Sequence, residues 1–142
     1  MSRHDDTVTL RQMHDHLVEA IALAETRKRS DLDSDRVFFL ALLKLVEIVG
    51  EAATRISVPF QTSHPEMPWR EIISSRNRLI HGYDSVDADI LWTIVTVDFQ
   101  PLAKQIKSLL PDTQKKKEVE VSGLNFAQVI DRNGRSAPDH PP

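Results

Sequence analysis

The stretch "VFFLALLKLVEIVG", from Val37 to Gly50, is the most apolar run in the chain, and it decides which fold the sequence predicts. The run contains Lys44 and Glu47 and is shorter than the roughly 20 apolar residues that a helix needs to span a bilayer. Its apolar residues go nearly all the way round a helix, which therefore needs cover on several sides. We expect a buried helix over about residues 35–56 that is covered partly by a second subunit.

Periodic apolar residues predict three more helices around this one. They run over about residues 9–27, 68–81 and 88–110. Proline suits the first turn of a helix, which favours the start at residue 68, and Gly82 is a suitable stop for the same helix. A proline inside the last helix, Pro101, is expected to kink it.

The segments between these helices are polar or rich in proline. The polar break "RKRSDLDSD" covers residues 27–35, and Asp33, Ser34 or Asp35 is expected to cap the helix that follows. Three prolines fall within residues 57–68, so this segment is expected to be a loop rather than continuous helix.

The composition bounds both the fold and its surroundings. The chain has 142 residues, which suits one domain. Only two of its four glycines lie in the first 110 residues, which favours an all-α bundle of four main helices over a turn-rich sheet. There is no cysteine, so disulfides and thiolate metal sites are excluded. The first ten residues lack an apolar segment, so we expect no signal peptide, no membrane association and a cytoplasmic location.

The last part of the chain differs in composition from the rest. Residues 112–142 are rich in charged and turn-forming residues, so we expect a helical domain over residues 1–111 followed by a charged, mobile tail. The run "KKK" at residues 115–117 fits either a solvated surface or a contact with RNA or a partner. The net charge of −3 and the isoelectric point near 6.0 argue against a broad surface for nucleic acid, but they allow a small phosphate site.

A second stretch, "SSRNRLIHGYDSVD" over residues 74–87, packs Arg76, Asn77, Arg78, His81 and Tyr83 into eight residues. If the helix continues to His81, then Asn77 and His81 are four residues apart and share one face. Arg76 can reach a group that His81 holds, and Tyr83 is nearly in line with Arg76 on the same helical path. The stretch can therefore place a guanidinium, an amide, an imidazole and a phenol together.

These groups suit the chemistry of a phosphodiester. Arginine donates two hydrogen bonds to phosphate oxygens and stabilises charge that builds on phosphorus, and histidine can move a proton near neutral pH. Since RNA carries its own nucleophile, the 2′-hydroxyl, Arg76 and His81 could cleave it without a metal or a cofactor. The spacing alone also fits an ordinary helix end, because basic side chains in a last turn interact favourably with the helix dipole.

The motifs together resemble a known family. "RNRLIHGY" matches the pattern Arg-x-x-x-x-His-x-Tyr, and it lies inside "PWREIISSRNRLIHGYDSVDADILW". The upstream "EIVGEAATRIS" and the downstream "VDFQPLAKQIKSLL" fit as well. In this order they resemble the HepT-type toxins of the HEPN superfamily, over roughly residues 10–110.

The resemblance implies a homodimeric helical bundle that acts as a metal-independent ribonuclease, the toxin of a type VII-like toxin–antitoxin pair. It implies that Arg76 and His81 are catalytic and that Asn77 is a supporting polar residue. It also implies a partner, an MNT-type nucleotidyltransferase antitoxin that transfers AMP from ATP onto Tyr83 and silences the toxin. Nothing carries over to the tail.

Two alternatives stay open at this point. The chain could be a non-catalytic HEPN module that presents a nucleotide or substrate to a partner nucleotidyltransferase, or a purely structural helical dimer. Glu47 and Glu51 share one helical face and could pair with an arginine at a dimer centre, or they could simply be solvated. Trp69 and Trp92 could stack on a base, although packing in the core or in an interface is the more common role of tryptophan.

Overall fold

The computed structural model describes residues 5–81 and 85–111 of the chain. The helices are α1 (Asp6–Glu25), α2 (Asp31–Ser34), α3 (Arg36–Thr54), α4 (Val58–Ser63), α5 (Trp69–Leu79), α6 (Ala88–Thr93) and α7 (Phe99–Leu109). A π-helical turn, η1 (Ile94–Asp98), joins α6 to α7, and β1 (Ile80–His81) pairs with β2 (Ser85–Val86). The all-α prediction is confirmed. Tyr83 and the predicted tail lie outside the described residues.

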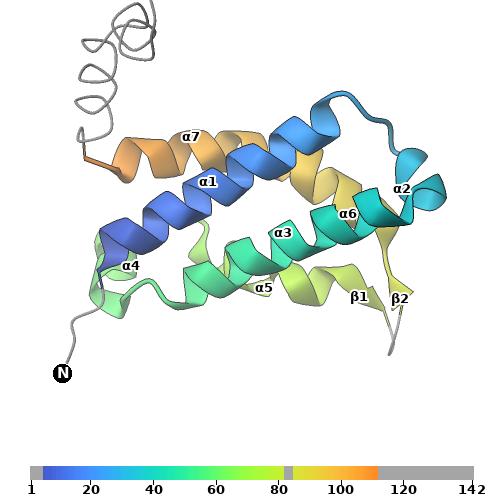
Figure 1. The fold of residues 1–142 in the computed structure, drawn as a ribbon. Coiled ribbons are helices and arrows are strands. Elements are labelled where there is room, and N and C mark those ends of the chain that lie inside the picture. The colour runs from blue at the N-terminus through green and yellow to red at the C-terminus, as the bar shows by residue number, and fades with distance from the viewer. Residues whose placement is uncertain (1–4, 82–84, 112–142) are drawn as a thin grey trace, which may run out of the picture. The chain divides into compact units, whose positions relative to one another are not determined.

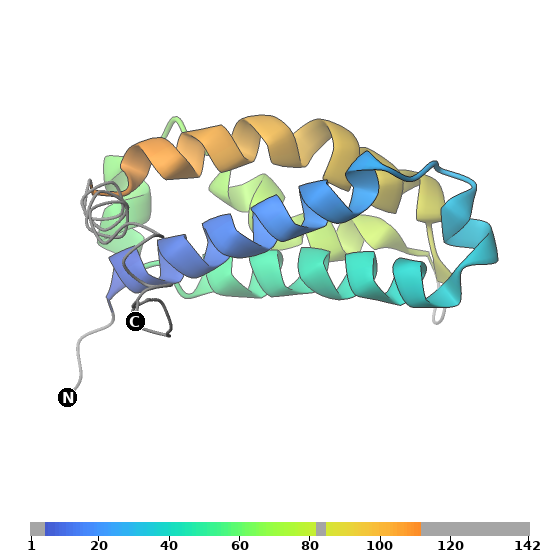
Figure 2. The same ribbon diagram turned by 45° about the horizontal axis from the view of Figure 1, so that its top comes forward.

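Four long elements form a bundle in which each runs opposite to the one before it. These are α1, α3, α5 and the continuous path of α6, η1 and α7 (Figures 1 and 2). Helix α1 lies against both α3 and α7, and α3 lies against α5. Helix α3 thus stands between α1 and α5 and has one side left for other contacts.

A single hydrophobic core joins these elements. Its largest fully buried side chains come from every long helix, and they are Leu10, Met13, Leu17, Leu42, Val46, Val49, Leu79, Leu91, Ile94, Val95 and Ile106. Burying side chains of this size stabilises a fold by about 1.5–3 kcal/mol each relative to leaving them exposed. The core therefore fixes the relative positions of α3 and α5, and α5 carries Arg76 and Asn77 of the predicted site.

The apolar surface of α3 is buried by its own chain to a greater extent than the sequence predicts. The core of the same chain already buries Phe38, Leu42, Leu45 and Val49, so these residues need no second subunit. The apolar side chains that remain in contact with solvent lie towards the start of the helix, where Leu40 is 45% exposed. A helix that is apolar nearly all round is thus covered by its own chain on most, but not all, of its surface.

The helix starts follow from side-chain caps. Asp35 accepts a hydrogen bond from the backbone N–H of Phe38, as one of the predicted caps of α3. The segment predicted to be a loop over residues 57–68 contains the short helix α4, which the sequence interpretation did not identify. Ser57 caps α4 by accepting from the N–H of Phe60, and proline is tolerated in the first turn, where its missing N–H costs nothing.

The end of α5 is a correction to the predicted helix over residues 68–81. Helix α5 ends at Leu79, because Ile80 adopts an extended conformation with φ −96° and ψ 123°. Ile80 pairs with Val86 across the short antiparallel ladder, and the backbone N–H of Asp87 donates to the carbonyl of Leu79 at 2.7 Å. Ile80 is β-branched and therefore suits this extended, paired position.

The path formed by α6, η1 and α7 departs from α-helical geometry at η1, before Pro101, rather than at Pro101 itself. A proline ring collides with the carbonyl four residues earlier, which here belongs to Val97. Val97 lies in η1, where the wider turn of a π-helix accommodates this disturbance. The predicted kink therefore takes the form of a π-helical turn over the β-branched segment Ile94–Asp98.

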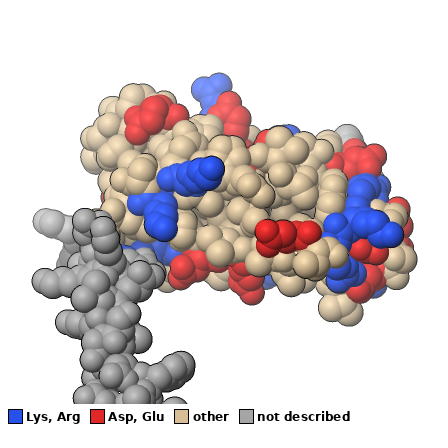
Figure 3. All heavy atoms as spheres, turned by 90° about the horizontal axis from the view of Figure 1, so that it is seen from above, with Lys and Arg blue, Asp and Glu red and all other residues tan. Residues whose placement is uncertain are grey.

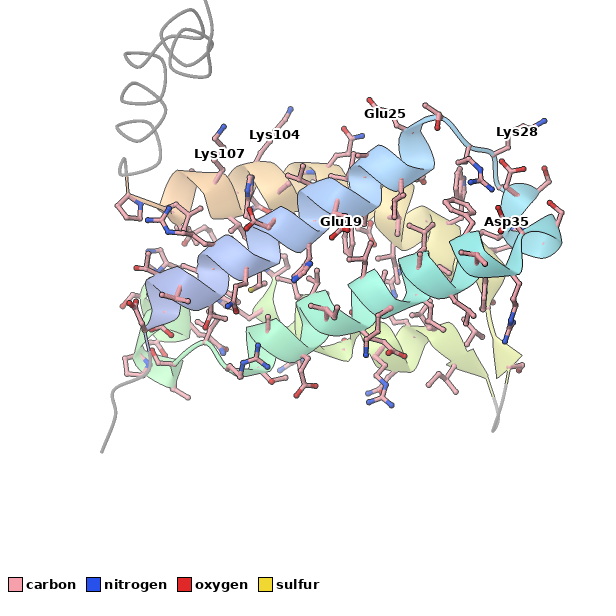
Figure 4. All side chains as sticks on the ribbon, viewed as in Figure 1. Glu19, Glu25, Lys28, Asp35, Lys104 and Lys107 are labelled. Atoms are coloured by element: carbon pink, nitrogen blue, oxygen red, sulfur yellow. The ribbon has the colours of Figure 1, made fainter. Side chains whose placement is uncertain are left out.

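Ion pairs fasten the α2 end of the bundle. Arg27 contacts Asp31 at 3.3 Å and Asp35 at 2.7 Å, and its guanidinium lies 4.1 Å from the ring centre of Phe38. Arg29 pairs with Asp89 on α6. Figure 3 shows basic and acidic side chains interleaved at this end, and Figure 4 shows Lys28 and Asp35 there, whereas Lys104 and Lys107 project from α7 into solvent.

These contacts predict how stability depends on pH. The hydrogen bond from Arg27 holds the pKa of Asp35 below its ordinary value, so the bond stabilises the fold above about pH 4 and is lost as the pH falls through the lowered pKa. We expect Asp35→Asn, which keeps a capping side chain, to lower the melting temperature near neutral pH and to converge with the wild type in acid. Thermal melts from about pH 7 to pH 2 measure this, with the exposed Asp15→Asn as control. A difference that stays constant across the range would contradict the assignment.

Candidate active site

Helix α5 presents its two neighbouring arginines to different surroundings. Arg78 lies against η1, where its Nη1 is 3.3 Å from a carboxylate oxygen of Asp98. It also lines an open groove of about 490 Å³ between α5 and α7. Arg76 lies on the side of α5 that faces α3. Residues two apart on a helix are rotated by about 200° and so point in nearly opposite directions. The two guanidinium groups therefore lie on different surfaces of α5.

Arg76 lines a surface cavity between α3 and α5, which we call the α3–α5 hollow. Its volume is about 380 Å³, and its other lining residues are Lys44, Glu47, Ile48 and Glu51 of α3 and Arg55, which directly follows that helix. Within the described part of the chain, none of its five charged side chains forms an ion pair. The hollow therefore holds three cations and two carboxylates that are available to a ligand.

A glycine sets the distance between the two helices at this point. Gly50 of α3 is buried against α5, and a Cβ at this position would lie 3.3 Å from the carbonyl oxygen of Ile72 and 3.4 Å from Oγ of Ser75. Ser75 is buried as well and donates its hydroxyl to the carbonyl of Ile72 at 2.8 Å. The helices approach closely here because no side chain separates them. Arg76, the next residue after Ser75, is held beside α3 as a result.

The direction of the helices places one glutamate nearer to Arg76 than the other. Helices α3 and α5 run antiparallel (Figure 1), so residues further along α5 lie beside residues earlier in α3. Gly50 faces Ile72 and Ser75, and Arg76 lies beyond them. By this register the backbone of Arg76 is nearly level with that of Glu47, and the backbone of Glu51 lies about one helical turn further along α3.

The other predicted site residues are placed differently from the sequence interpretation. Asn77 is exposed in the last turn of α5 and is not among the residues that line the hollow. His81 lies in β1, paired through its backbone position with Ser85, so Asn77 and His81 do not share a helical face as predicted. The short ladder, rather than a continuing helix, sets the direction of the chain at His81. Tyr83 falls outside the described residues.

The aromatic side chains have structural roles. Trp69 is buried, and its indole N–H donates to the carbonyl of His64 at 2.9 Å. Trp92 is half-buried and meets the ring of Phe38 edge to face, with the ring centres 6.5 Å apart. Both tryptophans thus follow the packing interpretation rather than base stacking.

Sequence reasoning missed part of the hollow. Lys44 and Arg55 were not singled out as site residues, although Lys44, Glu47, Glu51 and Arg55 recur every three or four residues along α3. Such a charged stripe on an otherwise apolar helix was the available signal. No group of three or more His, Asp or Glu side chains that could hold a metal ion occurs within residues 5–81 and 85–111. No helix in the same residues is long and apolar enough to cross a membrane.

Comparison with known proteins identifies the family. The family described as "Ribonuclease HepT-like" matches residues 13–109. A Thermococcus cleftensis protein named "Probable ribonuclease HepT" is 37% identical over 97 residues, which are 66% of this chain and 88% of that protein. A protein of Caldanaerobacter subterraneus subsp. tengcongensis named "Putative RNase TTE0752" is 36% identical over 80 residues, 56% of this chain and 71% of that protein.

A third relative extends the match over more of the chain. The Methanocaldococcus jannaschii protein named "Putative RNase MJ1380" is 28% identical over 107 residues, 75% of this chain and 98% of that protein. No solved structure matches the chain significantly. The family match covers α3 and α5, the hollow between them and the motif that follows, and the chain therefore belongs to the ribonuclease HepT-like family of HEPN proteins.

Proposed function

We propose that this chain is the toxin of a type VII-like toxin–antitoxin pair and that it cleaves RNA without a metal ion. The observation that carries the proposal is the environment of Arg76. Its guanidinium lines an open hollow and is not tied up in an ion pair with any described residue, in contrast to Arg78, which pairs with Asp98. Ribonuclease activity at the level of the family supports the same conclusion.

The proposed chemistry uses the 2′-hydroxyl of RNA as the nucleophile. His81 takes the proton from this hydroxyl as its oxygen bonds to phosphorus, and the bond from phosphorus to the 5′-oxygen breaks. The leaving 5′-oxygen takes up a proton that His81 gives back, and a 2′,3′-cyclic phosphate remains. Arg76 stabilises the additional charge on the phosphoryl oxygens, and Asn77 supports the site as a hydrogen-bonding side chain.

A second copy of the chain would complete this site. Exposed apolar residues flank the hollow, with Val37 and Leu40 on α3 and Ile73 and Ile80 on either side of Arg76. Ile73 and Arg76 are three residues apart on α5 and so lie on one side of that helix, and Ile80 follows in β1. Apolar surface that continues across two elements is typical of an interface between proteins. A homodimer joined here would bring two copies of the motif into one cleft.

Control by a partner is the second half of the proposal. We propose that an MNT-type nucleotidyltransferase transfers AMP from ATP onto the Tyr83 hydroxyl, with release of pyrophosphate. The added phosphodiester carries about one negative charge, which would pair with Arg76 and His81 and occupy the space that RNA needs. A non-catalytic module that presents a nucleotide to such a partner is the alternative, and absence of RNA cleavage would favour it.

The role of Arg76 can be tested against a matched control on the same helix. We expect Arg76→Ala or His81→Ala to lower cleavage of RNA by at least about 100-fold, because loss of one group that stabilises charge or moves a proton costs this much. Arg78→Ala should keep most of the activity. Cleavage of total RNA in the presence of EDTA, with thermal melts of each variant, measures this. Equal losses in Arg76→Ala and Arg78→Ala would contradict the assignment, and a requirement for a divalent cation would contradict the mechanism.

The proposed dimer predicts the effect of charges on its apolar surface. We expect Leu40→Glu combined with Ile73→Glu to give a monomer of 16.1 kDa and to lose cleavage, because the interface would bury unpaired carboxylates. Val97→Glu is the control, since Val97 is 61% exposed and lies on η1. Light scattering at micromolar concentration measures the mass. A monomeric wild-type protein with full activity would rule out the composite cleft.

The proposed modification predicts a separation of activity from control. Tyr83→Phe should remain an active nuclease, because RNA supplies the nucleophile, but its partner should no longer silence it covalently. Intact-mass measurement after incubation with the partner and ATP should show AMP-sized additions on the wild type and none on Tyr83→Phe. Equal labelling of the two proteins would exclude Tyr83 as the acceptor.

A further inference from the structure

The two carboxylates in the α3–α5 hollow need an explanation. A surface that binds phosphate generally presents hydrogen-bond donors and positive charge, and a nearby carboxylate repels the ligand. Nevertheless Glu47 and Glu51 line the same hollow as Arg76. Neither forms an ion pair within the described part of the chain that would neutralise it. Their charge is therefore available to a ligand together with that of Arg76.

The charges in the hollow fit a ligand with one negative charge. Lys44, Arg55 and Arg76 contribute three positive charges, and the two glutamates contribute two negative ones, so the hollow carries a net charge of about +1. One phosphodiester carries one negative charge. A hollow without the glutamates would attract any polyanion, including DNA, more strongly than this one does. The glutamates thus lower the general affinity for nucleic acid in the place where RNA has to be chosen.

Glu47 is the carboxylate that can act together with Arg76. It lies beside Arg76 by the register of α3 and α5, and its side chain is half-buried, whereas Glu51 is exposed and lies one turn away. A ribose in RNA carries its 2′-hydroxyl next to its own 3′-phosphate. A guanidinium and a carboxylate side by side match these two neighbouring groups, because one donates hydrogen bonds to the phosphate and the other accepts one from the hydroxyl.

We infer that Glu47 accepts a hydrogen bond from the 2′-hydroxyl of the nucleotide whose 3′-phosphate Arg76 binds, until His81 takes this proton as attack on phosphorus begins, and that Glu47 thereby selects RNA over DNA. The inference rests on the proposed ribonuclease function and adds a specificity-determining residue to it. DNA has no hydroxyl to offer at this position, so its phosphate meets Arg76 beside an unsatisfied carboxylate. Both effects favour RNA.

The test measures the coupling between one side chain and one hydroxyl. His81→Ala protein, which does not cleave, is titrated by fluorescence anisotropy with a short RNA, with the same RNA carrying a single 2′-deoxy nucleotide at each position in turn, and with DNA of the same sequence. We expect one 2′-deoxy position to weaken binding about tenfold, as loss of a hydrogen bond to a charged group does. In the double variant His81→Ala, Glu47→Gln, the loss of affinity caused by the 2′-deoxy nucleotide at that position, which we call the positional effect, should fall to about twofold or less. The affinity of this variant for DNA should rise.

Glu51→Gln in the same background is the matched control, because it makes the same change of charge on the same face of α3. It should strengthen the binding of RNA and DNA by equal factors and leave the positional effect in place. If Glu47→Gln and Glu51→Gln changed the affinities for RNA, 2′-deoxy RNA and DNA in the same way, both glutamates would act only through their negative charge. That result would overturn the inference. A His81→Ala protein with no sensitive 2′-deoxy position would overturn it as well, even if Glu47→Gln failed to fold. Cleavage of RNA by the wild type is scored separately, so a protein that cleaves RNA but shows no coupling refutes the inference alone.

Discussion

The close contact between α3 and α5 at Gly50 is the constraint on which the rest of the site depends. A Cβ at Gly50 would lie only 3.3 Å from the backbone carbonyl oxygen of Ile72 and 3.4 Å from Oγ of Ser75, so a side chain there would push against α5. The hydrogen bond from Ser75 to Ile72 satisfies this hydroxyl inside the contact, so no polar group is left without a partner there. Because the two helices meet without an intervening layer of side chains, the residues next to the contact face each other across a narrow hollow.

Helix α3 divides its surface between two tasks. Its buried side, with Leu42, Val46 and Val49, joins the core and holds the helix against α1. Its other side carries the charged stripe that begins at Lys44 and ends at Arg55, together with exposed apolar residues near its start. The core thus acts as the rigid support of the hollow, and the charged side chains do not have to stabilise the fold themselves. This division leaves them available to the proposed ligand.

The sequence predicts most of the fold because the signals of these helices are local. Apolar periodicity and the cap at Asp35 define α3, and the long helices appear close to their predicted positions. The end of α5 could not be predicted in the same way, because Ile80 leaves the helix to pair with Val86, six residues further along the chain. The π-helical turn also depends on a clash between Pro101 and a carbonyl one turn earlier, which fixes a kink but not its form.

The candidate site could be predicted only in part. The motif identifies Arg76 from sequence, but the partners of Arg76 in the hollow come from a helix about 30 residues earlier in the chain, and only the packing of α3 on α5 brings them together. The different surroundings of Arg76 and Arg78 could not be predicted from the sequence either. Both are basic residues in the same helical turn, and only the packing of α3 beside Arg76 and the position of Asp98 in η1 beside Arg78 distinguish them.

The opposite orientation of these two arginines limits how the gene can change. A helix turns by about 100° per residue, so inserting or deleting one residue between Trp69 and Arg76 would rotate every later side chain of α5 away from its present neighbour. The guanidinium would leave the hollow, and Ser75 (after an insertion) or Asn77 (after a deletion) would take its place there. Insertions between α3 and α5, in the segment that contains α4, do not rotate α5 against α3 in this way. Length variation among relatives should therefore accumulate before Trp69, while the spacing from Trp69 to Arg76 stays constant.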